Sequence, residues 1–238
     1  MNLADRIIHK IRGTVVEIDL SQAEVFEVLE RHGVESWFRY IYRERKNRWD
    51  VWMPAVWIAE NCSKDSVVFE TGCGCGFNLL WLGQRGFSSL YGSDIEQKAV
   101  NAAAELASLA GMSMDLWQDD ALKPRRLPEQ TDILIANWTC FDERFSLGVF
   151  LELYAPVMAR HGVLVLDVID SSYDSVPNNR YLTSEWNKPE GERAPSEYKV
   201  RYSREQVAAI SSSAGFQIDK VLYRKQLIPR RVYLLRKM

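Results

Sequence analysis

The stretch ETGCGCGFNLLWL, residues 70–82, places three glycines and two cysteines in the five positions 72–76. The run VVFE, residues 67–70, is short and apolar and ends in an acid, which is typical of a buried strand. The segment FNLLWLGQRG that follows has helical spacing and ends at Gly86. The glycines therefore occupy a strand-to-helix turn, where glycine permits positive φ and lets a ligand approach the backbone closely.

The two cysteines of this turn raise the alternative of a metal or redox site. A structural zinc site usually draws its ligands from C-x₂₋₄-C pairs, together with a second pair of Cys or His. Cys73 and Cys75 form a C-x-C pair, and the nearest histidines in the sequence are His32 and His161. A disulfide between the two cysteines would be strained. We therefore expect no metal site, and we interpret both cysteines as small residues that fill the turn.

The helix behind the turn offers free N–H groups and a positive dipole end, as nucleotide sites at the carboxyl end of a strand do. The dinucleotide fingerprint G-x-G-x-x-G would require its third glycine at Phe77 or Leu79, so neither register fits. The spacing is instead E-x-G-x-G-x-G, with Glu70 two residues before the first glycine. A carboxylate there repels a pyrophosphate and attracts an ammonium group, which disfavours an NAD-dependent oxidoreductase.

With this motif the sequence resembles the class I S-adenosylmethionine-dependent methyltransferases, whose first motif is an acid followed by G-x-G-x-G. The resemblance implies S-adenosylmethionine as cofactor. LYGSDIEQKAV supplies a second strand that ends at Asp94, where the family binds the ribose hydroxyls, and Ile95 would lie against the adenine ring. MDLWQDDAL ends a third strand, and the family's acid-then-alanine pattern at the adenine amino group matches Asp120 and Ala121, with Asp119 as the competing register.

The resemblance continues through the later strands. TDILIANW, residues 131–138, is the fourth strand, with Asn137 beside the sulfonium, and VLVLDVID, residues 163–170, is the fifth, entered through a turn at residues 161–162. SAGFQIDKVLY and RRVYLLRKM predict a closing strand pair. The cofactor-binding residues that the resemblance implies are Glu70, Gly72, Gly74, Gly76, Asp94, Ile95, Asp119, Asp120, Ala121 and Asn137.

Strands alternate with helices along the chain, which predicts an α/β fold. We expect a doubly wound, mostly parallel seven-stranded sheet with helices on both faces and an antiparallel last strand. Residues 1–54 are expected to form an N-terminal helical cap or lid, and residues 55–238 the Rossmann-like domain, with an insertion loop at 171–199. The candidate contacts are Arg39, Tyr40, Tyr42 and Arg43 for the methionine carboxylate, and Tyr173, Arg180, Tyr181 and Trp186 for the acceptor.

No residue can be assigned as a catalytic base from the sequence. Methyl transfer from a sulfonium needs a base only if the acceptor must lose a proton. The candidates that follow strands four and five are Asp142, Glu143, Asp170 and Asp174. The N-P-P-Y signature of amide and nucleobase amine methylation is absent, because residues 137–140 read NWTC. These observations leave the acceptor atom, oxygen or nitrogen, open.

Composition limits the kinds of binding partner and the cellular compartment that the sequence supports. The 238 residues are 47% hydrophobic and 26% charged, as in globular proteins, and a net charge of −2 gives no basic field for nucleic acid. No apolar run approaches the length of about 18 residues that spans a bilayer. Four cysteines and an N-terminus without a signal peptide's apolar centre predict a cytoplasmic protein.

Together these features predict a methyltransferase for a small-molecule acceptor, without nucleic-acid or membrane partners. An S-adenosylmethionine-binding protein without catalysis and a methyltransferase acting on a macromolecule are the alternatives. The sequence predicts no particular oligomeric state.

Overall fold

The fold is seen in a computed structural model, which describes residues 18–34, 36–43, 49–140, 145–171, 200–224 and 230–238. Within these ranges no helix is long and apolar enough to cross a membrane. In chain order the elements are α2 (Gln22–Arg31), α3 (Ser36–Arg43), α4 (Trp49–Asn61), β1 (Val68–Thr71), α5 (Phe77–Gln84), β2 (Leu90–Asp94), α6 (Gln97–Leu109), β3 (Asp115–Gln118), β4 (Thr131–Cys140), α7 (Leu147–Tyr154), the 3₁₀ turn η1 (Ala155–Val157), β5 (Met158–Ile169), α9 (Arg204–Ser213), β6 (Phe216–Arg224) and β7 (Arg230–Lys237).

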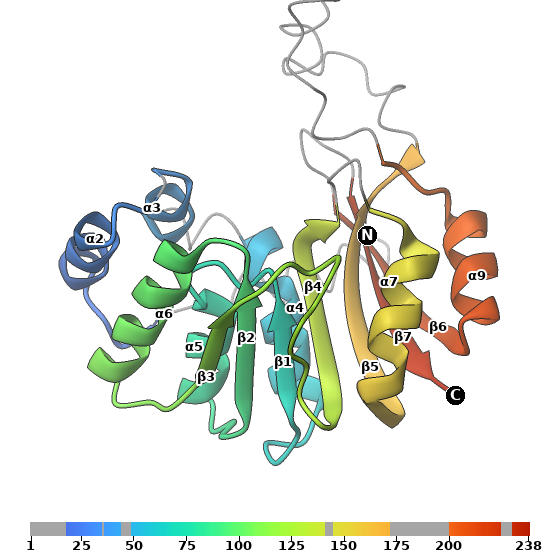
Figure 1. Ribbon diagram of the computed structural model, residues 1–238, viewed down its shortest axis with the longest axis horizontal. Coiled ribbons are helices and arrows are strands. Elements are labelled where there is room, and N and C mark those ends of the chain that lie inside the picture. The colour runs from blue at the N-terminus through green and yellow to red at the C-terminus, as the bar shows by residue number, and fades with distance from the viewer. Residues whose placement is uncertain (1–17, 35, 44–48, 141–144, 172–199, 225–229) are drawn as a thin grey trace, which may run out of the picture.

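The strands form one seven-stranded sheet in the order β3-β2-β1-β4-β5-β7-β6 (Figure 1). Strands β1 to β5 are parallel to one another, whereas β7 is antiparallel to both β5 and β6. The prediction of a mostly parallel sheet with an antiparallel last strand is therefore confirmed. The strand order reverses between β1 and β4, and in sheets of this kind ligands bind at the carboxyl ends of the strands beside such a reversal.

Successive residues of a strand point to opposite faces of the sheet. Both faces of this sheet are buried. In β4, Ile133 and Ile135 join an apolar cluster with side chains of α4, α5 and α6, while Leu134 and Ala136 join a second cluster with side chains of α7 and α9. Helices thus cover both faces, as the alternation of strands and helices predicted.

The helices α2 and α3 lie together at the β3 end of the sheet, next to α6 (Figure 1). Ser21 begins α2 with a capping box to Glu24, in which the Ser21 hydroxyl accepts from the Glu24 N–H. At the other end of α2, Arg31 and His32 both contact the carboxylate of Glu105 on α6, the latter at 2.7 Å. These contacts attach the N-terminal helices to the core.

Helix α4 crosses the boundary predicted between residues 54 and 55. Pro54 lies inside the helix, and Met53, Ala55 and Val56 on either side of it are buried in the core. The change from cap to core therefore does not coincide with the end of a helix.

The start of the fifth strand differs from the prediction. Strand β5 begins at Met158, so the expected turn at residues 161–162 lies inside the strand. The register with β4 passes from Thr131↔Met158 to Ile133↔Val163, and His161 within this irregularity has a φ of 65°. β5 has three more residues than β4 between these two pairs, so the ladder is irregular here, and sequence periodicity does not reveal such an irregularity.

Candidate functional site

The acidic residues singled out in the sequence lie at the carboxyl ends of neighbouring strands. Glu70 is the second-last residue of β1, Asp94 ends β2, and Asp119 follows β3 directly. The pairs Thr71↔Ser93 and Asp94↔Gln118 place these ends at the same edge of the sheet. Asn137 lies in β4 on the other side of β1.

The glycine turn joins β1 to α5 and is tied to β2. Gly72, Gly74 and Gly76 all have left-handed backbone, with φ of 67°, 54° and 69°, and Gly76 is the N-cap residue of α5. The N–H of Gly74 donates to Asp94 Oδ2 at 2.8 Å. Asp94 Oδ1 accepts from the N–H of Glu96 at 3.0 Å, so the carboxylate links the turn to the start of the next helix. Burial raises the pKa of Asp94 above its ordinary value.

Glu70 carries a buried carboxyl group with one oxygen uncommitted. The side-chain amide of Asn78, in the first turn of α5, donates to Glu70 Oε1 at 2.7 Å. Glu70 Oε2 has no hydrogen-bond partner among the described residues. Burial, followed by repulsion from Asp94, raises the pKa of Glu70 to about 8, although the bond from Asn78 acts in the opposite direction. The uncommitted oxygen fits a cationic hydrogen-bond donor.

Sequence reasoning missed Asn78, although it lies inside the opening stretch. Its signal was a polar amide in the otherwise apolar run FNLLWL, and its side chain is buried at 7% exposure. A buried amide usually has a hydrogen-bond partner, and the acid of the preceding strand is that partner here.

The two acids after β3 have different surroundings. The carboxylate of Asp119 is buried and accepts from the N–H groups of Asp120, Arg125 and Arg126 at 2.8–3.0 Å, so it holds the loop that follows β3. Burial acts to raise the pKa of Asp119, but these hydrogen bonds outweigh it and the pKa lies below its ordinary value. Asp120 is half-buried, and its Oδ1 accepts from the N–H of Leu122 at 2.9 Å.

Three further predicted residues line the same edge. Ile95 follows β2 and is 55% exposed. Asn137 is buried. The carbonyl oxygen of Ala121 accepts from the hydroxyl of Tyr154 at 2.9 Å, and that hydroxyl also contacts Thr71 Oγ1 at 3.0 Å.

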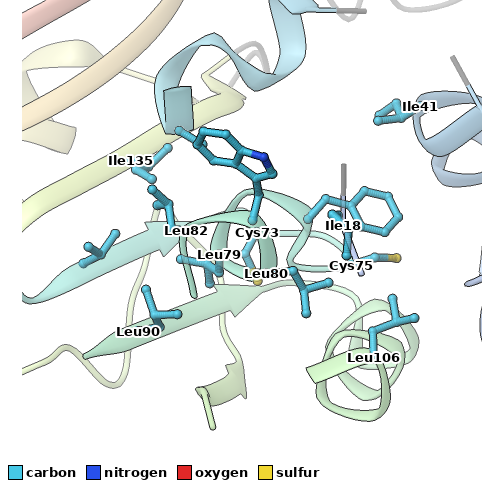
Figure 2. Close-up of a cluster of buried hydrophobic side chains, with 14 of the residues drawn as sticks. Ile18, Ile41, Cys73, Cys75, Leu79, Leu80, Leu82, Leu90, Leu106 and Ile135 are labelled. Carbon is cyan, nitrogen blue, oxygen red and sulfur yellow. The ribbon is translucent and has the colours of Figure 1, made fainter. Parts of the chain in front are cut away.

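Cys73 and Cys75 point into the apolar core. Figure 2 shows both side chains among aliphatic residues of α5, α6 and the sheet, including Leu79, Leu80 and Leu106. Burial raises the pKa of both thiols well above the ordinary value, so they are protonated. Within the described ranges no group of three His, Cys, Asp or Glu side chains could hold a metal ion.

The candidates from the cap have other contacts. Tyr42 is fully buried and its hydroxyl donates to the carbonyl oxygen of Leu20 at 2.7 Å, which makes it a core residue rather than a ligand contact. Arg39 pairs with Glu30 at 3.5 Å, and the guanidinium of Arg43 lies 5.8 Å from the centre of the Tyr40 ring.

Among the base and acceptor candidates, only Asp170 falls within the described part of the chain. It is buried and forms an ion pair with Arg231 of β7. The remaining candidates lie outside the described residues: Asp142, Glu143, Asp174, Tyr173, Arg180, Tyr181 and Trp186, with almost all of the 171–199 loop.

Comparison with known proteins assigns the central part of this chain. Residues 68–162, from β1 into β5, match the family model described as a methyltransferase domain. This segment has the sequence pattern of a methyltransferase domain. The ribosomal protein L11 methyltransferase of Caldanaerobacter subterraneus subsp. tengcongensis is 34% identical over 73 residues, which are 30% of this chain and 23% of that protein. The chain therefore matches less than a quarter of that relative's length.

Solved structures similar to the methyltransferase domain extend the likeness to most of the chain. Magnesium protoporphyrin IX methyltransferase from Synechocystis PCC 6803, solved with bound SAH, superimposes with a TM-score of 0.63 at 18% identity, covering 90% of this chain and 94% of that one. TehB from Haemophilus influenzae gives 0.63 at 14% identity, covering 83% and 66%. A SAM-dependent methyltransferase from Methanosarcina mazei gives 0.60 at 16%, covering 76% and 96%. The architecture is that of class I S-adenosylmethionine-dependent methyltransferases.

Proposed function

We propose that this chain binds S-adenosylmethionine and transfers its methyl group to an oxygen or nitrogen atom of a small-molecule acceptor. The observation that carries the proposal is the buried carboxyl group of Glu70. Its Oε2 has no hydrogen-bond partner among the described residues, and it lies beside a glycine turn tied to Asp94. An acid buried without a full set of partners is costly, and a cationic ammonium group of the ligand would supply the missing donor.

The other predicted residues are assigned by position. Asp94 accepts from the ribose hydroxyls in this proposal, because a carboxylate has lone pairs beyond those used by the Gly74 and Glu96 N–H groups. The exposed Ile95 covers the adenine ring. Asp120 and Ala121 face the adenine amino group, while Asp119 is assigned to its loop because three backbone N–H groups already occupy its carboxylate.

When bound, S-adenosylmethionine supplies a methyl group on a sulfonium, which is already activated for displacement. The chain therefore has to orient the acceptor and exclude water, which are the main contributions of proteins to such reactions. We assign no general base. Asp170 is engaged by Arg231, which disfavours it as a proton acceptor.

A small acceptor is supported by charge. The chain has a net charge of −2, and a protein that binds nucleic acid or an extended acidic surface usually carries a basic field. The Caldanaerobacter relative is called a ribosomal protein methyltransferase, which keeps a protein acceptor as the second candidate.

Calorimetric titration tests the cofactor assignment. We expect S-adenosylmethionine and S-adenosylhomocysteine to bind and NAD not to bind. Asp94→Ala should raise the Kd for both ligands about 10- to 100-fold, the effect of losing hydrogen bonds to a charged group. Asp115→Ala, which removes a partly exposed acid from the other end of β3, is the matched control and should leave the Kd unchanged. Binding of NAD in place of both methionine derivatives would refute the assignment.

Fractionated extract tests the acceptor class. We would supply methyl-labelled S-adenosylmethionine with either the ultrafiltrate or the macromolecular retentate of a cell extract, and measure S-adenosylhomocysteine release. The Asp94→Ala variant gives the background rate of S-adenosylhomocysteine release. Turnover with the ultrafiltrate is expected, and label transferred only to the retentate would replace the small-molecule proposal with a macromolecular one. Tight binding without turnover in either fraction would favour a binding protein without catalysis.

A further inference from the structure

The cap helix α3 is in direct contact with the glycine turn. A Cβ atom built on Gly74 would lie 2.4 Å from Cε1 and 2.8 Å from Cζ of Phe38. Real Cβ atoms do not approach other atoms that closely, so the ring of Phe38 occupies the space that a side chain at position 74 would need. Phe38 is half-buried and packs against the core cluster that contains the turn.

The same glycine holds Asp94. Its N–H donates to Asp94 Oδ2 at 2.8 Å, while the Phe38 ring covers its α-carbon. The peptide at Gly74 is therefore fixed from two directions, by a side chain of the cap and by a carboxylate of β2. Without the ring, the turn would lose its contact with the cap at this glycine.

The neighbours of Phe38 fix its position on the turn. Tyr42, one helical turn later, is fully buried, and its ring lies 5.4 Å from that of Phe77, the first residue of α5. The hydroxyl of Tyr42 donates to the carbonyl of Leu20 at 2.7 Å. Ile41 on the same side of α3 is also buried. Residues at i, i+3 and i+4 share one face of a helix. The face formed by Phe38, Ile41 and Tyr42 therefore packs on the turn and the start of α5.

We infer that Phe38 is a positioning residue for the cofactor site, which holds the Gly74 peptide against Asp94 and so couples docking of α3 to cofactor affinity. The inference rests on the proposed function. It gives a second reason why position 74 requires glycine. Besides the φ of 54°, the Phe38 ring fills the space that a side chain would need. Helix α3 and the end of β2, which are far apart in the sequence, thus both hold the same turn in place.

A double-mutant cycle on Phe38 and Gly74 tests this coupling, with the Kd for S-adenosylhomocysteine as the readout. Phe38→Ala should raise the Kd about 5- to 20-fold, a loss typical of one well-packed contact. Gly74→Ala alone should be far more severe, because the new methyl group meets the ring and the backbone is strained. In the Phe38→Ala background the ring is gone, so Gly74→Ala should cost about tenfold less than in the wild type.

Two matched variants separate positioning from general packing. Phe38→Leu keeps an apolar group over Gly74 and should recover most of the affinity. Trp37→Ala removes a ring from the outer side of the same helix, where Trp37 is 39% exposed, and should leave the Kd unchanged. If Gly74→Ala does not fold, these variants still decide the question through the Kd and through amide exchange of residues 36–43. Cofactor should slow that exchange in the wild type and in Phe38→Leu, and much less in Phe38→Ala.

The outcomes distinguish this inference from the proposed function. Normal ligand binding by the wild type with additive effects, within about twofold, would overturn the positioning role and leave the proposed function intact. Coupling that is seen in the free energy of unfolding but not in the Kd would also overturn it, because Phe38 would then be structural only. A wild-type protein that binds neither methionine derivative would refute the proposed function and the inference together.

Discussion

At the scale of single residues, the chemistry of the site is concentrated in Glu70. Its pKa of about 8 in the unliganded protein means that the group is mostly protonated at neutral pH. In the proposed function an ammonium group of the ligand would stabilise the carboxylate, so binding should release a proton. The affinity for the cofactor should therefore increase as the pH rises toward 8.

Glu70→Gln tests this linkage while keeping the bond from Asn78. Calorimetry at pH 7 in two buffers with different ionisation enthalpies should give a larger proton release for the wild type than for the variant. The ligand's own amino group titrates equally in both titrations and cancels in the comparison. Glu60→Gln, an exposed acid near the end of α4, is the control and should match the wild type. Equal proton release by the wild type and Glu70→Gln would contradict a role for Glu70 in binding the ammonium group.

The same substitution should stabilise the unliganded protein. The folded-state pKa of Glu70 is raised from 4.5 to about 8, so ionisation opposes folding as the pH rises through this window. Glu70→Gln should thus increase the free energy of unfolding by up to about 5 kcal/mol above pH 8, at about 1.4 kcal/mol per pKa unit. The gain should vanish below pH 4.5, where the unfolded wild type is also protonated. Urea unfolding at a series of pH values measures this difference, and a pH-independent difference would contradict the assignment.

At the scale of elements, the β1–α5 unit performs two tasks with alternate residues of one turn. The glycines supply the backbone conformation, while Cys73 and Cys75 fill the core beneath it. The double substitution Cys73→Ala/Cys75→Ala should lower the free energy of unfolding by about 1–3 kcal/mol, because two buried sulfur atoms are lost. The Kd for S-adenosylmethionine should change by less than about threefold, since neither thiol is assigned to the ligand.

The control for this element is Cys62→Ala, at a half-buried cysteine just after α4. It should change neither stability nor binding measurably. Loss of a bound metal from the double variant, detected by elemental analysis together with loss of binding, would show that the cysteines are ligands and that our interpretation of the turn is wrong.

At the scale of the whole molecule, the antiparallel pair β6–β7 is joined to the parallel strands through a buried ion pair. Arg230 begins β7 and Asp167 lies in β5, and neither side chain is more than 1% exposed. Arg230 Nε donates to Asp167 Oδ1 at 2.6 Å. Removing one member of such a pair leaves an uncompensated buried charge, whereas replacing both with apolar residues avoids that cost.

Arg230→Met should therefore lower the free energy of unfolding by about 3–5 kcal/mol, and Arg230→Met/Asp167→Leu should recover most of the loss. Arg236→Met, which breaks the exposed pair with Asp219, is the control and should cost less than about 1 kcal/mol. Urea unfolding measures all three variants. Equal losses in the single and double variants would indicate that packing, rather than the charge, holds the strands together.

The sequence by itself determined the parts of this protein that depend on local patterns. A short apolar run and helical spacing identified the strand and helix around the glycine turn, the family resemblance supplied the later strands, and the alternation of strands and helices predicted the mostly parallel sheet. The glycine turn was predicted at its observed place because left-handed backbone favours glycine at Gly72, Gly74 and Gly76. The apolar run that ends in Glu70 and the family resemblance at Asp94 predicted both acids at strand ends, and the structure has them there.

Only the tertiary structure decided what these residues contact. The hydrogen bonds of Asp119 distinguish it from Asp120, the burial of Glu70 raises its pKa, and the ring of Phe38 lies on Gly74. The irregular pairing around His161 is likewise defined by the register of β5 with β4. The physical reason is the same in each case. Desolvation, hydrogen-bond saturation and close packing depend on atoms that the fold brings together from distant positions, and no local pattern in the sequence records them.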